Sequence, residues 1–331
     1  MDRRVFLGSG LGFAVAAPLL TTLAAHAQSG EADAAAYPSR PVRILIPFAT
    51  GSSGDNLGRT LGDLLGDQLH QKFFVENPLG AGGLIGITTV ARAKPDGYTL
   101  LFSTPSLIIN PLLYASAKYD PFRDFEYVGM GWAQPAVFLA RKDSRFTTLQ
   151  QAVSEARSNP GKLTFGSAGI GTFNHLAGEL FGYRAGVKLT HIPYKGIAPA
   201  IVDMLGGRID FVFATVGVLV SNRDALKGLA VASASRSRAV PEVPTATEAG
   251  LTGWDYGSWG GIVAPAATPK TIIAKLSGAM ATGLAQSSYI ERFSRQGIDT
   301  QFTSSENFAA NARREFEVAS TLVKAIGLKG E

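Results

Sequence analysis

Apolar and polar positions form two alternating patterns along the chain from Tyr37 onward. Short, almost continuous apolar runs such as Val42–Phe48 are typical of strands that are buried on both faces. They alternate with longer segments in which apolar residues recur every three or four positions, as in amphipathic helices. In the first of these segments the recurring residues are Leu57, Leu61, Leu64, Leu65 and Leu69. This alternation predicts βαβ units and an α/β fold with mainly parallel sheets.

The same two patterns predict the remaining elements. Further strands are expected at Thr99–Ser103, Ala136–Ala140, Leu163–Phe165, Leu189–Ile192, Ile209–Ala214, Leu229–Ser233 and Ile262–Ala264. Helices are expected at Leu149–Ser158, Asn174–Tyr183, Pro199–Leu205, Thr271–Ala285 and Glu306–Ile326.

Two passages return the chain to a new apolar strand and suggest crossings between domains. They lie near Trp132–Gln134 and at the glycine-rich stretch Gly257–Gly261, where glycines permit the backbone changes of a hinge. If both passages cross a hinge, the first domain is discontinuous. We therefore expect one domain from residues 37–134 plus 258–331 and a second domain from residues 135–257.

Two short loops rich in glycine and serine each leave an apolar run and open a helical pattern. The first is Phe48–Asp55 and the second is Gly166–Thr172. A helix start carries unpaired backbone N–H groups and a partial positive charge, so each loop can hold an anion without a lysine or an arginine. Two such loops in one chain predict a ligand that is held from two sides.

Asp55 has two interpretations. As an N-cap, its carboxylate would accept hydrogen bonds from the first turn of the helix, and Ser53 could serve the same purpose. Alternatively, Asp55 faces the ligand through an amine or a water molecule. Capping is the commoner use of an aspartate at such a place, and it is the interpretation we favour.

Length and composition narrow the class of protein. The chain has 331 residues, of which 46% are hydrophobic, and this length indicates about two domains. Without the first 27 residues, 29 basic and 25 acidic residues remain, and they include no run of Lys or Arg. Such a small and diffuse excess argues against nucleic-acid binding. The absence of cysteine excludes disulfides, thiolate metal sites and a cysteine nucleophile.

Residues 1–27 have the organisation of an export signal peptide. Arg3-Arg4 resembles the twin-arginine signature, an apolar run extends from Gly8 to Ala25, and Ala25-His26-Ala27 offers a cleavage site. The run is also nearly long enough for an uncleaved membrane anchor, but its glycines and the cleavage pattern favour removal. The twin-arginine and general secretory routes both stay open. We expect a periplasmic protein with a disordered linker at residues 28–36.

Other kinds of site find less support. The run Gly80–Gly86 invites a dinucleotide-binding interpretation, but Ile85 stands where the third glycine of that motif belongs. A serine hydrolase would need a pair such as Ser167 and His175, although no G-x-S-x-G elbow is present. The histidines that follow the leader lack the i, i+4 spacing of a helical zinc site. We therefore expect no cofactor, no metal site and no catalytic residue.

Motifs spread over Tyr37–Leu328 resemble those of a known family. The motifs are Tyr37–Arg43, Pro47-Phe48 with Gly51 and Asp55, Val75–Asn77, Gly80–Gly83, Pro95–Leu101, Tyr119–Pro121, Ser167–Gly169, Gly171-Thr172, His175–Glu179, Pro193–Gly196, Pro244-Thr245 with Glu248–Gly250, Ala264-Pro265 and Thr268-Pro269. Together they are similar to the pattern of Bug-type receptors, the extracytoplasmic solute-binding proteins of tripartite tricarboxylate transporters.

This resemblance implies a type II periplasmic-binding-protein fold, in which two α/β domains close on a ligand, and it implies no catalysis. In such receptors the two helix-opening loops hold a ligand carboxylate, often partly through ordered waters. The ligand-binding residues expected by position, including those that would line the cleft between the loops, are Phe48, Thr50, Gly51, Ser52, Ser53, Asp55, Ser103, Thr104, Ser167, Ala168, Gly171, Thr172, Phe173, Tyr194, Thr215 and Trp259.

Three positions depart from the family pattern. Ser52 stands where a second glycine is usual, Phe173 where a small or polar residue is usual, and Ala214 where an Asp or Asn is common. Losing a polar group and gaining an aromatic ring favours a less hydrophilic ligand. Phe48, Phe173 and Trp259 could form an apolar wall for it, or could be ordinary core residues.

We therefore expect a monomeric receptor that captures a dicarboxylate or an aromatic carboxylate by cleft closure. It would deliver this ligand to the membrane permease subunits of a tripartite tricarboxylate transporter. Two alternatives stay open: an exported serine hydrolase with Ser167 as nucleophile, and a receptor that signals instead of transporting.

Overall fold

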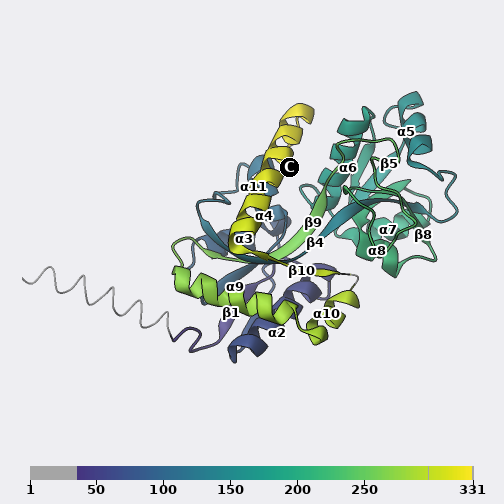
Figure 1. Cartoon of the computed structure of the whole chain (residues 1–331). Helices are drawn as coiled ribbons and strands as arrows, with labels where there is room; N and C mark the ends of the chain where they lie inside the picture. The colour runs from purple at the N-terminus through teal and green to yellow at the C-terminus, as the bar shows by residue number, and fades with distance from the viewer. Residues whose placement is uncertain (1–35, 297, 330–331) are drawn as a thin grey trace, which may run out of the picture.

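The computed structural model describes residues 36–296 and 298–329, which form two lobes joined by a long strand (Figure 1). That strand, β4 (Phe125–Arg141), pairs with β9 (Gly257–Pro265) as far as Pro135. From Ala136 onward it pairs with strands of the second lobe. The chain thus enters the second lobe along β4 and returns along β9.

Each lobe is built around one part of a continuous sheet. In the first lobe the strand order is β2 (Phe73–Glu76), β1 (Val42–Leu45), β3 (Thr99–Ser103), β9 and β4, and β10 (Thr300–Ser304) also pairs with β4. In the second lobe the order is β4, β7 (Phe211–Thr215), β5 (Thr164–Ser167) and β6 (Thr190–Pro193), and β8 (Leu226–Val231) also pairs with β4.

The predicted α/β class is confirmed. Strand β1 pairs in parallel with β2 and β3, and β5 pairs in parallel with β6 and β7. The antiparallel pairs all involve β4 or β9, because the chain runs out along one of these strands and back along the other. Strand β1 is buried except at Arg43, as its apolar run predicts.

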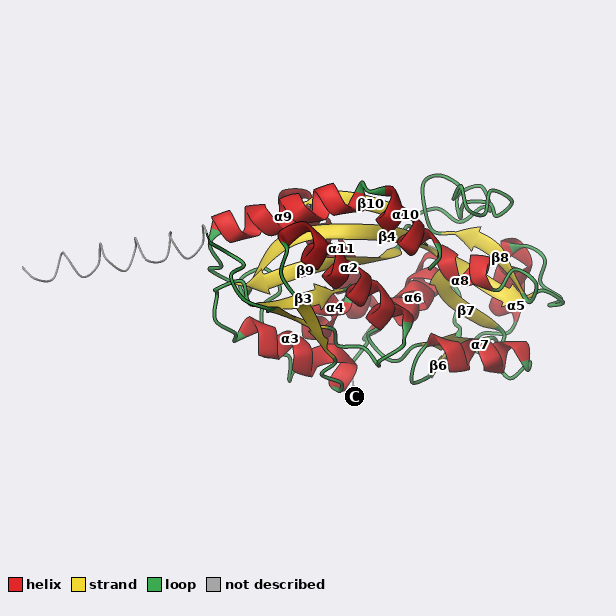
Figure 2. Cartoon of the chain, turned by 90° about the horizontal axis from the view of Figure 1, so that it is seen from below, coloured by secondary structure: helices red, strands yellow, loops and turns green. Residues whose placement is uncertain are grey.

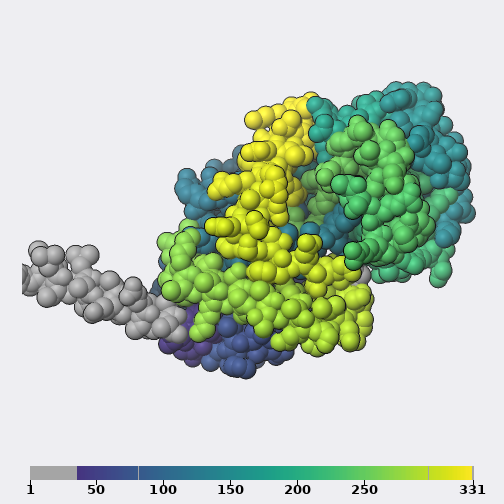
Figure 3. Space-filling model, viewed as in Figure 1, coloured from purple at the N-terminus to yellow at the C-terminus, as the bar shows by residue number. Residues whose placement is uncertain are grey.

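Helices cover the sheet on both sides, with α9 and α3 on opposite faces of the first lobe (Figure 2). The described helices are α2 (Ser53–Leu69), the short 3-10 helix η1 (Ala81–Gly83), α3 (Leu84–Ala91), α4 (Ser106–Leu113), α5 (Leu149–Ser158), α6 (Phe173–Ala185), α7 (Ile197–Leu205), α8 (Val216–Ser221), α9 (Lys270–Leu284), α10 (Ser287–Ser294) and α11 (Ser305–Ile326). Helix α11, yellow in Figure 3, rises along the boundary between the lobes.

An apolar core continues across the junction between the lobes. In the second lobe Phe138 stacks on Phe213, with ring centroids 4.7 Å apart. The segment that leads back to β9 is fastened to α6 at two points. Trp254 Nε1 donates a hydrogen bond to the carbonyl of Ala177 at 3.0 Å, and the ring of Tyr256 stacks on that of Phe173. The start of α6 is therefore coupled by packing to the strand that returns to the first lobe.

Among the described residues, none of the helices is both long and apolar enough to cross a membrane. The predicted signal peptide, residues 1–27, and all of the predicted linker except residue 36 lie outside the described part of the chain.

Two glycine substitutions test how tightly the crossing strands are packed. A Cβ atom at Gly257 would lie 2.5 Å from the backbone oxygen of Gln134, so Gly257→Ala should destabilise the protein by about 1–3 kcal/mol. Gly278 is an exposed position inside α9, and a Cβ atom there would meet nothing within 4 Å. Gly278→Ala should therefore stabilise the protein by about 0.5–1 kcal/mol, as expected for glycine in a helix interior. Urea unfolding measures both changes, and equal effects of the two substitutions would contradict the close approach of β4 and β9.

Candidate ligand-binding cleft

A cavity of about 430 Å³ lies between the two lobes. Its first-lobe lining comprises Phe48, Ser52, Ser53, Gly54, Leu57, Phe102, Thr104, Pro105, Ser106, Gln296 and Ile298. Its second-lobe lining comprises Ala168, Thr172, Phe173, Asn174, Gly196, Ile197, Ala198, Ile201, Thr215, Gly217, Val218, Ser221 and Asn222. Trp132, Gln134 and Ser258 line it where β4 and β9 pass between the lobes. None of these described lining residues has a charged side chain.

Helix α2 begins at the cavity with free backbone donors. Ser52 is its N-cap: it is extended (φ −70°, ψ 163°), and its Oγ accepts a hydrogen bond from the N–H of Asp55 at 3.3 Å. The N–H groups of Ser53 and Gly54 have no hydrogen-bond acceptor within the described part of the chain. The expectation that Asp55 or Ser53 caps the helix is wrong, because both residues already lie in the first helical turn.

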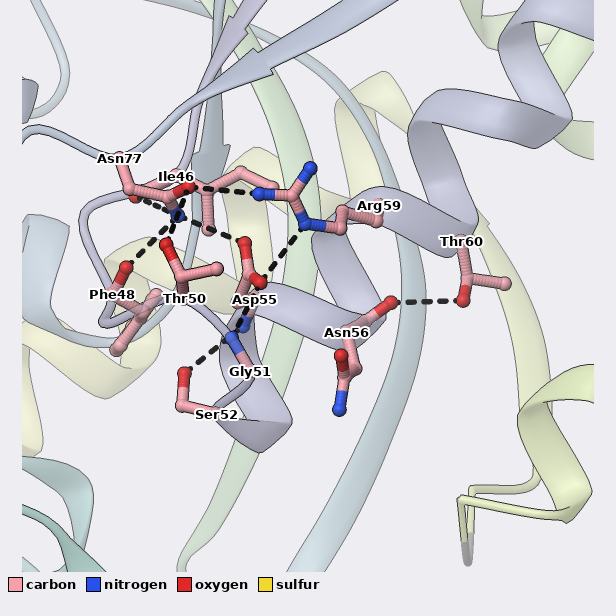
Figure 4. A network of polar contacts seen from close by, with 10 residues as sticks. All are labelled: Ile46, Phe48, Thr50, Gly51, Ser52, Asp55, Asn56, Arg59, Thr60 and Asn77. Atoms are coloured by element: carbon pink, nitrogen blue, oxygen red, sulfur yellow. Dashed lines mark hydrogen bonds and ion pairs between the residues drawn. The ribbon is translucent and has the colours of Figure 1, made fainter.

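Asp55 instead fixes the first loop from inside (Figure 4). Its Oδ2 accepts hydrogen bonds from the N–H of Gly51 at 2.8 Å and from Arg59 Nε at 2.9 Å. Its Oδ1 accepts a hydrogen bond from Asn77 Nδ2 at 2.8 Å, and Nδ2 also donates to the carbonyl of Phe48 at 2.9 Å. Asp55 is only 1% exposed. Both carboxylate oxygens therefore bind protein donors, and the side chain does not line the cavity.

These contacts keep Asp55 ionised. Burial alone raises the pKa of the carboxyl group, whereas the hydrogen bonds from Arg59, Gly51 and Asn77 and the charge of Arg59 lower it. The second group of effects is larger, and the pKa of Asp55 lies below its ordinary value of 3.8. The loop is thus held by a carboxylate whose charge is balanced inside the first lobe.

Helix α6 begins on the second-lobe side of the cavity in a similar way. Its N-cap Thr172 is extended (φ −78°, ψ 159°), and Thr172 Oγ1 donates a hydrogen bond to the carbonyl of Gly169 at 2.7 Å. The N–H groups of Phe173 and Asn174 find no acceptor among the residues that the structure describes. The two lobes therefore direct unpaired donors and partial positive charge into one cavity.

Comparison with known proteins identifies the type of cleft. A model of the tripartite tricarboxylate transporter family receptor matches residues 57–328. The chain belongs to this receptor family. The receptor is 36% identical over 301 residues to a Pseudomonas sp. (strain P51) protein described as "UPF0065 protein in tcbD-tcbE intergenic region". That match covers 90% of this chain and 86% of the relative.

Solved structures of similar proteins support the same family assignment. The periplasmic binding protein BugD has 34% sequence identity and a TM-score of 0.78, over 89% of the receptor and 100% of BugD. An R. palustris protein solved with adipate has 30% identity and a TM-score of 0.80, over 88% and 99% of the two chains. The predicted resemblance to Bug-type receptors and the two-domain periplasmic-binding-protein fold are confirmed. The receptor is a solute-binding protein and not an enzyme.

Ser167 and His175 do not form the pair that a hydrolase would need. Ser167 is fully buried and does not line the cavity. Its Oγ lies 2.6 Å from Nε2 of His191, on the neighbouring strand β6, and accepts a hydrogen bond from the N–H of Gly169 at 3.0 Å. Ser167 therefore shapes the turn that precedes α6.

The residues predicted to bind the ligand divide into two groups. Phe48, Ser52, Ser53, Thr104, Ala168, Thr172, Phe173 and Thr215 line the cavity. Thr50, Gly51, Asp55, Ser103, Ser167, Gly171, Tyr194 and Trp259 are not among its lining residues. Most of the second group support the loops: Thr50 Oγ1, for example, donates to Asn77 Oδ1 at 3.4 Å.

The expected aromatic wall contains Trp132 in place of Trp259. Across the β4–β9 pair, Trp132 lies opposite Gly260 and Trp259 lies opposite Ala133. Successive side chains of a strand point to opposite faces of the sheet, so the two indoles lie on opposite faces. Trp132 lines the cavity, whereas Trp259 donates a hydrogen bond from Nε1 to Glu315 of α11.

The structure of the second lobe corrects the expectations that Tyr194 lines the cleft and that Ala214 alters its polarity. The Tyr194 hydroxyl donates a hydrogen bond to Asp203 Oδ2 of α7 at 2.8 Å, and Tyr194 does not line the cavity. Ala214 is buried in β7 opposite Val137, and its lack of a polar group does not alter the cavity wall. The next residue, Thr215, reaches the cavity instead.

Many of the apolar residues that line the cavity could not be identified from the sequence as ligand-binding residues. Leu57 and Phe102 carry the signature of ordinary core residues, since they belong to an amphipathic helix and a buried strand. Ile197 and Ile201 lie on one face of α7, and Ile298 lies in the connection before β10. Only the folding of distant segments onto one cavity distinguishes these side chains from the rest of the core.

Replacing Asp55 by asparagine tests the network behind the first loop. Asp55→Asn keeps the size of the side chain but turns one acceptor oxygen into a donor that faces other donors. We expect the free energy of unfolding to fall by about 1–3 kcal/mol at neutral pH, as for buried polar groups left without partners. The control Asp63→Asn removes the same charge from an exposed ion pair with Arg292, and it should change the stability by about 0.5 kcal/mol or less. Urea unfolding of both variants measures the difference.

The pH dependence of that difference tests the charge itself. Because the pKa of Asp55 is lowered by folding, its carboxylate stabilises the folded state above pH 3.8, and this stabilisation is lost as the pH falls through the folded-state pKa. The difference in unfolding free energy between wild type and Asp55→Asn should be constant from about pH 7 to about pH 5 and shrink below that. A difference that stays constant down to acid unfolding would contradict an ionised Asp55.

Proposed function

We propose that the protein is a periplasmic receptor that captures a small carboxylate with an apolar body and delivers it to the membrane subunits of a tripartite tricarboxylate transporter. The observation that carries this proposal is the cavity itself. It has no charged side chain among its described residues, yet two helices from opposite lobes direct free N–H groups into it. A fixed partial positive charge of this kind suits an anion.

The balance of the lining favours one anionic group joined to an apolar body. Backbone donors at Ser53, Gly54 and Phe173 would bind the carboxylate. Leu57 and Trp132, with Phe102, Ile201, Val218 and Ile298, would cover the rest of the ligand. Burial of a ring or an alkyl chain against such side chains contributes roughly 25 cal/mol for each Å² removed from water. A cavity of about 430 Å³ is also of the size that holds small organic ligands.

The absence of acidic lining residues argues against ligands that carry an amine. An ammonium group brought into this cavity would meet no carboxylate among the described lining residues. Leaving a buried charge without a partner is costly, because its hydration is lost and not replaced. The adipate bound to the R. palustris protein is a carboxylate without an amine, and it supports the same ligand class for this receptor.

Capture would proceed by movement of the lobes about β4 and β9. We take residues 37–134 plus 258–331 as one domain and residues 135–257 as the other, with the ligand-binding residues on both. Export would remove residues 1–27, and the Arg3-Arg4 pair favours the twin-arginine route. The mature receptor would act as a monomer.

Matched pairs of ligands test the proposed class. Succinate and aspartate differ by one amino group, and so do 3-phenylpropionate and phenylalanine. We expect the compound without the amine to bind at least about tenfold more tightly in each pair, because a buried unpaired ammonium costs more than about 1.4 kcal/mol. We also expect 3-phenylpropionate to bind more tightly than succinate. Isothermal titration calorimetry on the purified mature protein gives the four dissociation constants.

Two results would contradict the proposal. Tighter binding of the amino acids would show that the cavity recognises an ammonium group. No binding of any small carboxylate at millimolar concentration, with no rise in melting temperature, would reject the carboxylate-receptor assignment.

A further inference from the structure

The two helix-opening loops share a backbone conformation and a hydrogen bond that are not evident from their sequences. Gly51 and Gly171 both have a left-handed backbone, with φ of 81° and 76°, and each directly precedes the N-cap of its helix. The N–H of each glycine donates a hydrogen bond to the side chain four residues later. The acceptor is Asp55 Oδ2 at 2.8 Å in the first loop and His175 Nδ1 at 3.2 Å in the second.

The two acceptors are supported by different chemistry. The carboxylate of Asp55 is paired with Arg59, four residues further along α2, at 2.9 Å. The imidazole of His175 lies against Glu179, also four residues further along its helix, with 3.5 Å between Nε2 and Oε1. Because Nδ1 accepts the hydrogen bond from Gly171, it carries no proton, and the proton of the neutral ring is on Nε2.

The environment of His175 holds its ring in one orientation. The side chain is 2% exposed and stacks on the ring of His191, with centroids 3.9 Å apart and an angle of 18° between the rings. Burial lowers the pKa of His191 to about 3, so the stacked partner is uncharged at neutral pH. The His175 ring can therefore hold the second loop in place through its acceptor nitrogen, through its packing against His191, or through both.

Gly171, whose N–H donates to His175, also lies close to side chains of the first lobe. A Cβ atom on Gly171 would lie 3.0 Å from the Leu113 side chain and 3.5 Å from that of Tyr114, at the end of α4. The hydroxyl of Tyr114 donates a hydrogen bond to the carbonyl of the preceding residue, Ile170, at 3.2 Å. A shift of this loop would therefore move the start of α6 relative to both the cavity and the first lobe.

We propose that His175 is a positioning residue for ligand binding: its Nδ1 fixes the N–H of Gly171 and so orients the free N–H groups of Phe173 and Asn174 toward the cavity. This inference rests on the proposed carboxylate-binding function. His175 itself does not line the cavity, and it acts on the ligand through the loop.

Two substitutions separate the acceptor from the packing. His175→Asn retains an acceptor at the position of Nδ1 but loses the ring. His175→Phe retains an aromatic ring against His191 but loses the acceptor. A role in positioning predicts that binding follows the acceptor, whereas a purely structural role predicts that binding follows the ring.

The affinities for 3-phenylpropionate and succinate are measured by calorimetry on wild type and both variants. We expect His175→Asn to stay within about threefold of wild type and His175→Phe to bind about tenfold more weakly, the effect of one lost hydrogen bond that orients a site. The melting temperature should show the opposite order, with His175→Asn the less stable variant. Wild-type affinity in His175→Phe, or equally weak binding in both variants, would overturn the proposal.

Measurements on the ligand-free protein keep this test independent of the proposed function. Amide exchange at Gly171, followed by NMR, should be slow in wild type and His175→Asn and at least about tenfold faster in His175→Phe. Nitrogen NMR of the wild-type imidazole should show an unprotonated Nδ1, and a proton on Nδ1 would overturn the proposal even if a variant fails to fold. If wild type binds neither probe but Gly171 is protected as expected, the proposed function fails while the hydrogen bond is established.

Discussion

The structure depends on one constraint: the first N–H groups of an α-helix have no partner inside the helix. Here two such groups in α2 and three in α6 are left without acceptors in the described protein, and both helices begin at the same cavity. Their partial charges cannot be neutralised by side chains, since no described lining residue is charged. An anionic ligand would satisfy donors from both lobes at once. Closure of the lobes would then be coupled to binding of the anion, because only the closed arrangement lets one anion reach the donors of both helices.

The residues behind the loops explain how this arrangement is held without entering the cavity. Asp55, Arg59 and Asn77 form a balanced network inside the first lobe, and they leave the donors of Ser53 and Gly54 free. In the second lobe His175 takes the place of the aspartate and accepts the hydrogen bond from the N–H of the loop glycine, Gly171. In both lobes the charged side chains lie behind the loop and not among the described residues that line the cavity.

The sequence predicts those parts of the structure that local patterns determine. Helix α5 has the predicted bounds because its apolar period and its N-cap Thr148 are both local signals. Helix α4 is missed because it is apolar on most sides and contains Pro111. Trp132 and Trp259 cannot be told apart from sequence, since the register of β4 and β9, with its irregularity between Met130 and Trp132, decides which indole faces the cavity. The role of Ser52 likewise depends on its extended backbone, and the contact of Ser167 with His191 depends on the pairing of β5 with β6.

The most direct measurement deletes one backbone donor. Ser53 is the first residue of α2, where proline is well tolerated, and the extended Ser52 before it suits a following proline. Ser53→Pro removes the N–H group, whereas the control Ser53→Ala removes only the hydroxyl group. We predict that Ser53→Pro binds 3-phenylpropionate about tenfold more weakly than Ser53→Ala at an unchanged melting temperature, as expected for loss of a hydrogen bond to a charged group. Equal affinities of the two variants would contradict recognition by the helix N-terminus.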